Sequence, residues 1–573
     1  MPRPAVARAR MSTVRIAAGT TLDGGGVLRP LAEDGTPAGP EERVDDLVRA
    51  IGARERADSP RWVWSATGRI YPRLLAAGVR VARCHDLELV EALVLSHEGR
   101  YGQPRSVRAA LARLRGEPVP GDAAPADGGQ PTLFGGAEDT ADEMAALIAV
   151  HADQRRRIAA TEHPERLGLL AAAESAGGLI AAEMTHEGLP WSATRHDALL
   201  TELLGPRPGP GLRPRRLQEL ADRIAQEFGG RRPVNPDSPA QLVKAFAAEG
   251  VIVPSTRSHV LRRVDHPAVP LLLEYKELAR LHTAHGWSWL DSWVRQGRFR
   301  PEYVVGGVPS GRWATRGGGA LQIPRVLRRA VVADPGWTLV VADAAQLEPR
   351  VLAALAGDRA FAAAAAKGDL YAALSDAFGT GDDARDKAKI ALLSAMYGGG
   401  TGEAVQLLAV LRNRFPDAFG YVEAAARAGE AGRLVRSRLG RTCPPPSAAW
   451  RDLTSDGFAG QDETRAGAAL RSRGRFTRNF VVQASAADWA LALMALLRGR
   501  LDGLVQKDDR RDVPHLVFFQ HDEVIVHARK ELADEVAEAI RAAAAEAGRL
   551  LFGRTQVVFP MEIAAVDCYA DAK

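Results

Sequence analysis

Two apolar runs in the second half of the chain end on acidic residues. One run covers residues 338–343 and closes on Asp343, while residues 516–519 and 524–526 flank the polar tip His521, Asp522 and Glu523. Short apolar runs bounded by polar residues are typical of buried strands, and two runs separated by a short tip predict a hairpin. Because an unpaired carboxylate beside an apolar sheet is costly to desolvate, we expect a positive partner between Asp343 and Asp522.

A pair of Mg²⁺ ions would be a suitable partner for these two aspartates. Two hard cations about 4 Å apart, bridged by carboxylates, can hold the attacking and leaving oxygens of a phosphoryl transfer. Taken singly, each aspartate is also compatible with an ordinary turn residue. The segment between them is therefore important for the interpretation.

That segment contains a four-residue repeat at Arg385, Lys389, Leu393 and Tyr397, followed by glycines at 398–400. Side chains four apart lie on one face of a helix, and glycines commonly end one. Two cations near the helix start and an aromatic near its end could hold a triphosphate and a base. The alternative is an amphipathic helix whose cations are solvated. A second stripe, Arg475, Asn479 and Gln483, has the same spacing and the same alternative.

The first part of the chain alternates strand-like and helical segments. Residues 13–21, 62–64 and 79–81 are strand-like, and helices are expected over 70–77 and from Asp86 onward. This alternation predicts a small α/β domain. Farther along, residues 217–228, 239–249 and 269–285 have the apolar spacing of amphipathic helices.

Taken together and in this order, these motifs resemble the polymerase region of bacterial DNA polymerase I, the family A DNA polymerases. Residues 343–350 are similar to the first palm motif, 385–397 to the fingers helix and 521–523 to the second palm motif. Residues 310–312 and 321–324 are similar to the segment that leads into the palm. The resemblance covers roughly the last 400 residues, and three ordered motifs with matching spacing make it specific.

The resemblance implies template-directed nucleotidyl transfer to a primer 3′ end, in repair or gap-filling synthesis. Asp343, Asp522 and the carbonyl of Ala344 would hold two Mg²⁺ ions, which Mn²⁺ can replace, with Glu523 in a supporting role. Arg385 and Lys389 would neutralise the triphosphate, and Lys389 would protonate the leaving group. Glu348 would exclude a ribose 2′ hydroxyl. The other implied nucleotide contacts are Gln346, Tyr371, Leu393 and Tyr397, and the implied DNA contacts are Arg312, Arg475, Asn479, Gln483 and His521.

Several positions depart from the family pattern. Leu393 stands where an aromatic residue is usual, Tyr371 where a triphosphate-contacting histidine is common, and Ala344 and Ala345 replace larger residues. Pro349 is also unusual, although in the first turn of a helix it loses no hydrogen bond. These departures leave open, as an alternative, a catalytically weak DNA-binding accessory protein that is recruited by the sliding clamp.

The implied fold is α/β plus α+β multidomain, with an RNase H-like exonuclease-type domain before a right-hand polymerase. We expect a tail at 1–12, the exonuclease-like domain at 13–165 and the polymerase at 166–573. Within the latter, the thumb is expected at about 200–305, the palm at about 306–357 and 485–573, and the fingers at about 358–484. No 5′ nuclease is expected before residue 13, because that domain would need about 300 further residues.

The 3′ to 5′ exonuclease chemistry is expected to be lost. That activity needs clustered carboxylates for two metals, beginning with Asp-x-Glu on the first strand, yet residues 13–21 contain no acid. Asp86 and Glu88 have the right spacing but follow a later strand, and His151 stands where the last acid is expected. We therefore predict a degenerate scaffold. The alternative is a bifunctional exonuclease and polymerase in which shifted acids bind the metals.

Residues 117–142 are rich in Pro, Gly, Ala and Asp and are expected to form a disordered loop. Within it, Gln130, Leu133 and Phe134 resemble the short peptide by which bacterial replication proteins dock on the sliding clamp. A flexible tether with two apolar anchors suits a small pocket. A chance match in a low-complexity loop is the alternative.

Composition limits the remaining possibilities. The chain has 573 residues, with 75 basic against 70 acidic and a net charge of +5, so a DNA-binding surface must be a local basic lining. Cys84, Cys443 and Cys568 are too dispersed for a disulfide framework, which fits a reducing, cytoplasmic location. No run of about 18 uncharged apolar residues is present, so no membrane span is expected. We expect a monomer whose partners are primer-template DNA and deoxynucleoside triphosphates.

Overall fold

The computed structural model describes residues 14–21, 23–122, 140–230, 234–378, 383–398, 403–455, 461–505 and 512–572. The chain forms two compact units. The first comprises Met1–His186, Tyr303–Ala314 and Ala342–Ile563, and the second comprises Glu187–Glu302, Thr315–Val341 and Ala564–Lys573. The domain boundaries expected from the sequence remain predictions, because one compact unit can contain several domains.

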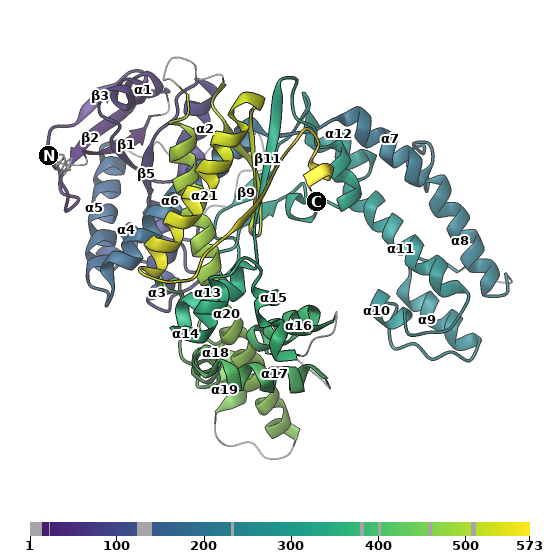
Figure 1. Ribbon diagram of the computed structural model, residues 1–573. Helices are drawn as coiled ribbons and strands as arrows, with labels where there is room; N and C mark the ends of the chain where they lie inside the picture. Colours follow the sequence, from purple (N-terminus) through teal and green to yellow (C-terminus); the bar gives the residue numbers. More distant parts are fainter. Residues whose placement is uncertain are drawn as a thin grey trace, which may run out of the picture. The chain divides into compact units, whose positions relative to one another are not determined.

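The first unit begins with a five-stranded sheet of order β3-β2-β1-β4-β5 (Figure 1). Strand β1 is antiparallel to β2 and parallel to β4, and β4 is parallel to β5. The strands are β1 (Arg15–Thr20), β2 (Gly26–Leu31), β3 (Glu42–Val44), β4 (Arg61–Trp64) and β5 (Arg83–Asp86). The expected strands near 13–21 and 62–64 are confirmed, and so is the α/β character of this region.

The expected strand at 79–81 is wrong, since the strand lies at Arg83–Asp86. Residues 78–81 instead complete the end of the preceding helix: Gly78 has φ +72° and the Val79 N–H bonds the Leu74 carbonyl at 2.8 Å. Val81 is buried from this loop with 1% exposure. An apolar residue can thus enter the core without belonging to a strand, which misled the alternation pattern.

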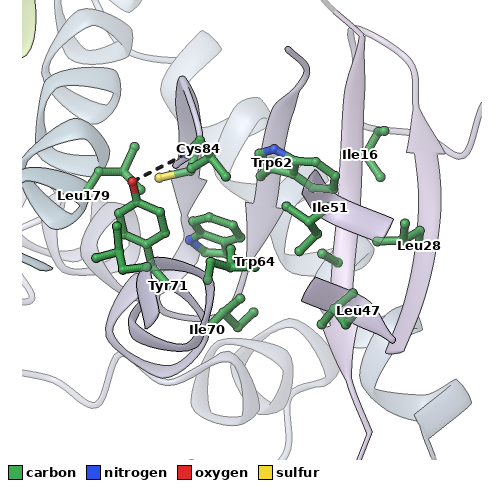
Figure 2. Packing of buried hydrophobic residues seen from close by; sticks show 14 residues of the cluster. Ile16, Leu28, Leu47, Ile51, Trp62, Trp64, Ile70, Tyr71, Cys84 and Leu179 are labelled. Atoms are coloured by element: carbon green, nitrogen blue, oxygen red, sulfur yellow. Dashed lines mark hydrogen bonds between the residues drawn. The ribbon is translucent and has the colours of Figure 1, made fainter. Parts of the chain in front are cut away.

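Helices cover both faces of this sheet. They are α1 (Leu47–Ala57), α2 (Thr67–Ala76), α3 (Leu87–His97), α4 (Val107–Arg115), α5 (Thr140–Ala159) and α6 (Pro164–Glu187). On one face, Trp62, Trp64 and Cys84 pack against Ile51 of α1 and Tyr71 of α2 (Figure 2). On the other face, alternate strand residues such as Ala17 and Val63 pack against Met144 and Leu147 of α5. Successive side chains along a strand point to opposite faces of the sheet, so alternate residues contribute to the two cores.

A second sheet has the order β12-β13-β11-β14. Its strands are β11 (Trp337–Ala344), β12 (His515–Gln520), β13 (Glu523–Arg529) and β14 (Met561–Val566). The last pair of the β12–β13 hairpin is Gln520↔Glu523, which leaves His521 and Asp522 as a two-residue loop. His521 has φ +58°, the left-handed conformation that tight hairpin loops require. The strand ending near Asp343 and the hairpin are both confirmed.

A group of helices completes the first unit. They are α13 (Leu347–Ala356), α14 (Arg359–Ala365), α15 (Leu370–Leu374), α16 (Ala384–Tyr397), α17 (Glu403–Arg414), α18 (Pro416–Glu430), α19 (Ala448–Thr454), α20 (Gln461–Leu501) and α21 (Ala533–Phe552). The expected helix at 385–397 is confirmed, and it ends at Gly398 in the left-handed conformation. α18 approaches α20 so closely that a Cβ at Gly429 would lie 2.0 Å from Thr477 Oγ1.

The second unit is largely helical (Figure 1). Its helices are α7 (Ala193–Leu204), α8 (Arg215–Glu227), α9 (Pro239–Ala248), α10 (Ser258–Leu261), α11 (Ala268–His285) and α12 (Trp287–Trp293). Short strands β6 (Leu189–Pro190), β7 (Val294–Arg295) and β8 (Arg298–Phe299) form a small sheet in this unit. A two-stranded sheet of β9 (Glu302–Val304) and β10 (Ala314–Arg316) includes residues assigned to each unit. The three amphipathic helices expected between residues 217 and 285 are confirmed within about two residues at each end.

Two helices in the described part of the chain are long and apolar enough to cross a membrane by length and composition. They are α6 and the segment Glu463–Leu501 of α20, and 67% and 78% of their apolar windows are buried inside the protein. A core helix passes the same test as a membrane span. Most of the apolar window of each helix is therefore buried by packing within the protein.

Candidate active site

Asp343 and Asp522 come from strand ends at one edge of the second sheet. Asp343 is the next-to-last residue of β11, and Asp522 lies in the loop between β12 and β13, next to β11 in the strand order. The Ala344 N–H donates to the Asp522 carbonyl at 3.1 Å, which ties the hairpin loop to the end of β11. The structure thus brings together the two aspartates that the sequence placed on separate strands.

The electrostatics of this pair favour a cation between the carboxylates. Burial, and after it the charge of Asp343, raises the pKa of Asp522 to about 6. Two nearby carboxylates disfavour one another's ionised form, and a bound cation reverses that preference. Glu523, beside them at the start of β13, is 5% exposed.

Hard divalent cations fit the oxygen donors present here. Carboxylate and carbonyl oxygens are the ligands that Mg²⁺ prefers in proteins. Across the described ranges, no group of three or more His, Cys, Asp or Glu side chains is placed to hold a metal ion. The fit therefore depends on Asp343 and Asp522, together with the Ala344 carbonyl that the family resemblance implies.

Glu348 links three segments next to the aspartates. It lies in the first turn of α13, and its carboxylate accepts hydrogen bonds from Arg312 and from the Tyr397 hydroxyl at the end of α16. Its side chain is only 12% exposed. Burial, and after it the charge of Arg312, lowers the pKa of His521, while Glu348 opposes this effect. Arg312 and Glu348 thus lie close to His521 of the hairpin loop, and Tyr397 is tied to them through Glu348.

Asp369 brings three other predicted residues together. Its carboxylate accepts from Arg385 Nε at 2.9 Å and from Gln346 Nε2 at 2.8 Å, and the Arg385 guanidinium lies 5.7 Å from the centre of the Tyr371 ring. Burial raises the pKa of Asp369, but the hydrogen bond from Arg385 and others lower it by more. Sequence reasoning missed Asp369, although its position as the N-cap of α15 was a readable signal.

The four-residue stripe of α16 faces away from the core. Arg385, Lys389 and Tyr397 are exposed and Leu393 is half-buried, while the opposite face buries Ala388, Leu392 and other apolar residues. Within the described residues Lys389 has no ion-pair partner. An exposed cation near the start of the stripe is available to an anionic ligand, as a triphosphate contact requires.

The stripe on α20 lies close to the end of α16. A Cβ at Gly398 would approach Arg475 Cγ to 3.0 Å, so the end of α16 abuts this arginine. Arg475 is exposed, and Asn479 and Gln483 are half-buried. The Asn479 Oδ1 is buried without a hydrogen-bond partner among the described residues. A buried polar atom left without a partner is unusual in a folded protein and is consistent with a contact surface.

Comparison with known proteins decides the family. The model of DNA polymerase family A matches residues 213–565, more than half of the chain. The chain belongs to DNA polymerase family A. The matched region includes the aspartate pair, Glu348, α16 and the α20 stripe, all of which were expected from the family's motifs.

Curated relatives include DNA polymerase I of Chloroflexus aurantiacus, which is 27% identical over 370 residues, or 57% of this chain and 36% of that protein. The thermostable DNA polymerase I of Thermus aquaticus is 27% identical over 314 residues, or 49% of this chain and 35% of that protein. The chain thus spans about a third of the length of these relatives.

The fold is similar to that of the POL domain of Pol1 from M. smegmatis, solved in complex with DNA primer-template and dNTP. The TM-score is 0.71, with 18% identity over 98% of this chain and 96% of that one.

Arg350 is a further residue of this family A site whose role the sequence did not show. It is fully buried, and its guanidinium donates to six oxygens, two in the β11–α13 turn and four from residues 365–368 and Val558. Nε bonds the Ala345 carbonyl at 2.9 Å, and the two terminal nitrogens bond the Gln346 side chain and the carbonyls of Ala365, Lys367, Gly368 and Val558. It therefore holds the backbone that follows Asp343.

The candidate exonuclease residues have other partners. Asp86 caps α3 through the Leu89 N–H at 2.9 Å and accepts the Thr67 N–H at 2.7 Å. Glu88 forms an ion pair with Arg69 at 2.9 Å. His151 packs edge-on against His85, with ring centres 4.8 Å apart. Asp86 and Glu88 are thus engaged in local structure. The clamp-like residues Gln130, Leu133 and Phe134 lie outside the described residues.

Proposed function

We propose that this chain is a template-directed DNA polymerase that adds deoxynucleotides to a primer 3′ end, in repair or gap-filling synthesis. The observation that carries the proposal is the pairing of Asp343 with Asp522 at the edge of the sheet, within the region matched to DNA polymerase family A. A solved protein of similar fold binds DNA primer-template and dNTP. Deoxynucleoside triphosphates and primer-template DNA are accordingly the proposed substrates.

Divalent metal ions are general in family A polymerases. For this chain we propose two Mg²⁺ ions, replaceable by Mn²⁺, held by Asp343, Asp522 and the carbonyl of Ala344. When bound, such ions would supply activation of the primer hydroxyl and compensation of charge on the departing pyrophosphate. The raised pKa of Asp522 supports the proposal, because burial and a neighbouring carboxylate make this a place where positive charge is favourable.

The side chains around the pair have distinct proposed roles. Arg385 and Lys389 neutralise the triphosphate, and Lys389 delivers a proton to the leaving group. Glu348, held by Arg312 and Tyr397, limits the space beside the sugar and so excludes a 2′ hydroxyl. Two hydrogen bonds fix this carboxylate, which a steric gate requires.

The α20 stripe is proposed to contact the DNA. Arg475, Asn479 and Gln483 would probe the minor groove, where every correct base pair offers an acceptor, so that geometry is checked without reading sequence. The unpartnered Asn479 Oδ1 supports this role. His521 and Arg312, beside the hairpin loop, would contact the primer strand.

For the N-terminal region we propose a degenerate RNase H-like exonuclease scaffold. Its support is the sheet order β3-β2-β1-β4-β5, with β2 antiparallel to β1 and with β4 and β5 parallel to it, flanked by helices. The first strand carries no acid, and Asp86 and Glu88 already cap a helix and pair with Arg69. We also propose a cytoplasmic monomer, and docking of Gln130, Leu133 and Phe134 on the sliding clamp.

One labelled, mismatched primer-template tests the polymerase and exonuclease proposals together. Asp343→Asn and Asp522→Asn should each abolish primer extension while DNA binding persists, because each removes a metal ligand and no DNA contact. Asp512→Asn is the matched control: it lies just before β12, where it pairs with Arg529, and should extend like the parent. Extension within tenfold of the parent by either variant would reject the proposed site. DNA binding by the parent without any extension would instead favour an accessory role.

Shortening of the same labelled primer measures any 3′ to 5′ exonuclease activity. We expect no metal-dependent shortening by the parent. Shortening that Asp343→Asn abolishes would be reversal of the polymerase reaction. Shortening that only Asp86→Ala abolishes would show an active exonuclease and refute the degenerate scaffold.

A further inference from the structure

A row of three arginines crosses the N-terminal sheet. Arg15 of β1 is the register partner of Arg61 of β4, which is the partner of Arg83 of β5. Register partners in parallel strands point to the same face, and neighbouring strands lie about 4.8 Å apart. The three Cα atoms therefore form a line of about 10 Å, with the side chains side by side.

A fourth arginine joins the row from helix α5. Two residues farther along the strands, on the same face, lie Ala17, Val63 and His85. Ala17 and Val63 pack against α5, and His85 Nε2 lies 2.9 Å from the Gln154 Oε1 of that helix. Arg155 follows Gln154. Burial, and after it the charge of Arg155, lowers the pKa of Arg15, and burial, and after it the charge of Arg83, lowers the pKa of Arg61.

These charges are not neutralised within the part of the chain that the structure describes. None of the four arginines forms an ion pair there, and the hydrogen bonds of Arg61 and Arg83 go to backbone carbonyls, those of Cys84 and Ser59, each at 3.1 Å. The Nε atoms of Arg15, Arg83 and Arg155 are buried with no hydrogen-bond partner.

The neighbouring acids do not offset the row. The charge of Glu33 partly opposes the lowering of the Arg15 pKa, and the charge of Arg155 adds a small lowering to the pKa of Asp34. Neither acid forms an ion pair with these arginines. Asp34 instead accepts from its own turn, from the N–H and hydroxyl of Thr36. Buried donors and clustered like charges are both costly, so the arrangement calls for an anion.

His151 provides an independent indication of a ligand. It is 1% exposed on α5, and its Nδ1 is buried without a partner among the described residues. Its ring packs edge-on against His85, which lies two residues beyond Arg83 on the same face of the sheet. Burial, then His85, and then Arg155, Arg15 and Arg61 lower the pKa of His151. The His151 nitrogen and the guanidinium nitrogens of the row are buried polar groups without partners. One molecule with several acceptor oxygens could hydrogen-bond to all of them.

We propose that Arg15, Arg61, Arg83 and Arg155 form a binding site for a phosphate dianion, as free orthophosphate or as the terminal phosphate of a nucleotide. Guanidinium groups match phosphate oxygens with paired donors, and a tetrahedral dianion can accept from several of them at once. An internal phosphodiester has one charge and two free oxygens, and so suits four clustered cations less well. This site is separate from the aspartate pair and goes beyond the proposed polymerase activity.

The test measures binding to the whole chain by calorimetry, with three probes: orthophosphate, dAMP, and a short oligonucleotide without terminal phosphates. We expect one orthophosphate or dAMP per chain, and at least tenfold weaker binding by Arg61→Gln and by Arg155→Gln. Arg49→Gln is the matched control, because Arg49 is exposed on α1, against the opposite face of the sheet. It should bind like the parent.

A second measurement shows that the variants are folded. Removing one of four repelling cations should raise the thermal midpoint of the phosphate-free protein, and phosphate should raise the midpoint of the parent more than that of Arg61→Gln or Arg155→Gln. Binding of dAMP but not orthophosphate would identify a nucleotide as the source. Three results would overturn the proposal. They are no binding of phosphate at about 10 mM, equal binding by the parent and all variants, and equally strong binding of the unphosphorylated oligonucleotide through these arginines. Primer extension by the same samples is expected to be unchanged in Arg155→Gln, so failure of the polymerase proposal would be seen separately.

Discussion

Asp522→Asn should stabilise the metal-free protein although it abolishes the proposed activity. Burial and the charge of Asp343 raise the pKa of Asp522 from 3.8 to about 6. The folded protein therefore keeps a proton on this carboxyl over a pH range in which the unfolded chain has already lost it. Holding the charged form in the folded state costs free energy, and asparagine removes that cost while keeping the shape of the side chain.

The size of the effect follows from the shift. About two pKa units at about 1.4 kcal/mol each correspond to a penalty of roughly 3 kcal/mol, fully present above pH 6. Because the folded protein binds more protons between pH 4 and 6, the free energy of unfolding of the parent falls as pH rises through that window. The variant lacks this fall. For a unit of several hundred residues the penalty is worth about 3 °C in the thermal midpoint.

The assay is thermal unfolding in a chelator, without DNA, at pH 8 and near pH 4. We expect Asp522→Asn to unfold a few degrees above the parent at pH 8, with the gap closing near pH 4. Added Mg²⁺ should raise the parent's midpoint and narrow the gap, since a cation stabilises the charged pair. Asp512→Asn, which loses an ion pair with Arg529 near the base of the same hairpin, should show no gain. A variant that is less stable than the parent at pH 8, or a gap independent of pH, would refute the reasoning.

Three further predictions concern other parts of the chain. Arg350→Lys should lower the free energy of unfolding by about 3–5 kcal/mol, because the three donors on the single lysine nitrogen cannot serve the six oxygens that Arg350 bonds; denaturant unfolding measures this, and a loss under 1 kcal/mol would contradict it. Glu348→Ala should raise ribonucleotide incorporation relative to deoxynucleotide incorporation by at least tenfold, and an unchanged ratio in single-nucleotide extension would show that Glu348 is no gate. Loaded sliding clamp should lengthen the products of the parent but not of Leu133→Ala/Phe134→Ala, and equal lengthening of both would make the peptide a chance match.

Local patterns were sufficient to predict much of this structure. The stripe of α16, the apolar run ending at Asp343 and the hairpin around Asp522 were all readable, because helix and strand periods depend on residues close together in the chain. The limits of locality are seen at residues 79–81. There Val81 is buried in the core from a loop, and the strand is formed by Arg83–Asp86. Most residues of that strand are charged or polar, so its sequence lacks the apolar pattern of a strand.

The sequence by itself indicated most of the helices and strands around the candidate site and, through ordered motifs, the family to which the chain belongs. Only the tertiary structure decided which distant side chains meet. Asp369 accepts hydrogen bonds from Gln346 and Arg385, and Arg350 donates to a backbone carbonyl 208 positions away in the sequence. Buried polar groups need hydrogen-bond partners, and the folded backbone determines which residues are close enough to supply them. The row of Arg15, Arg61 and Arg83 exists only because strand register aligns three segments, and register is a property of the sheet and not of any one strand.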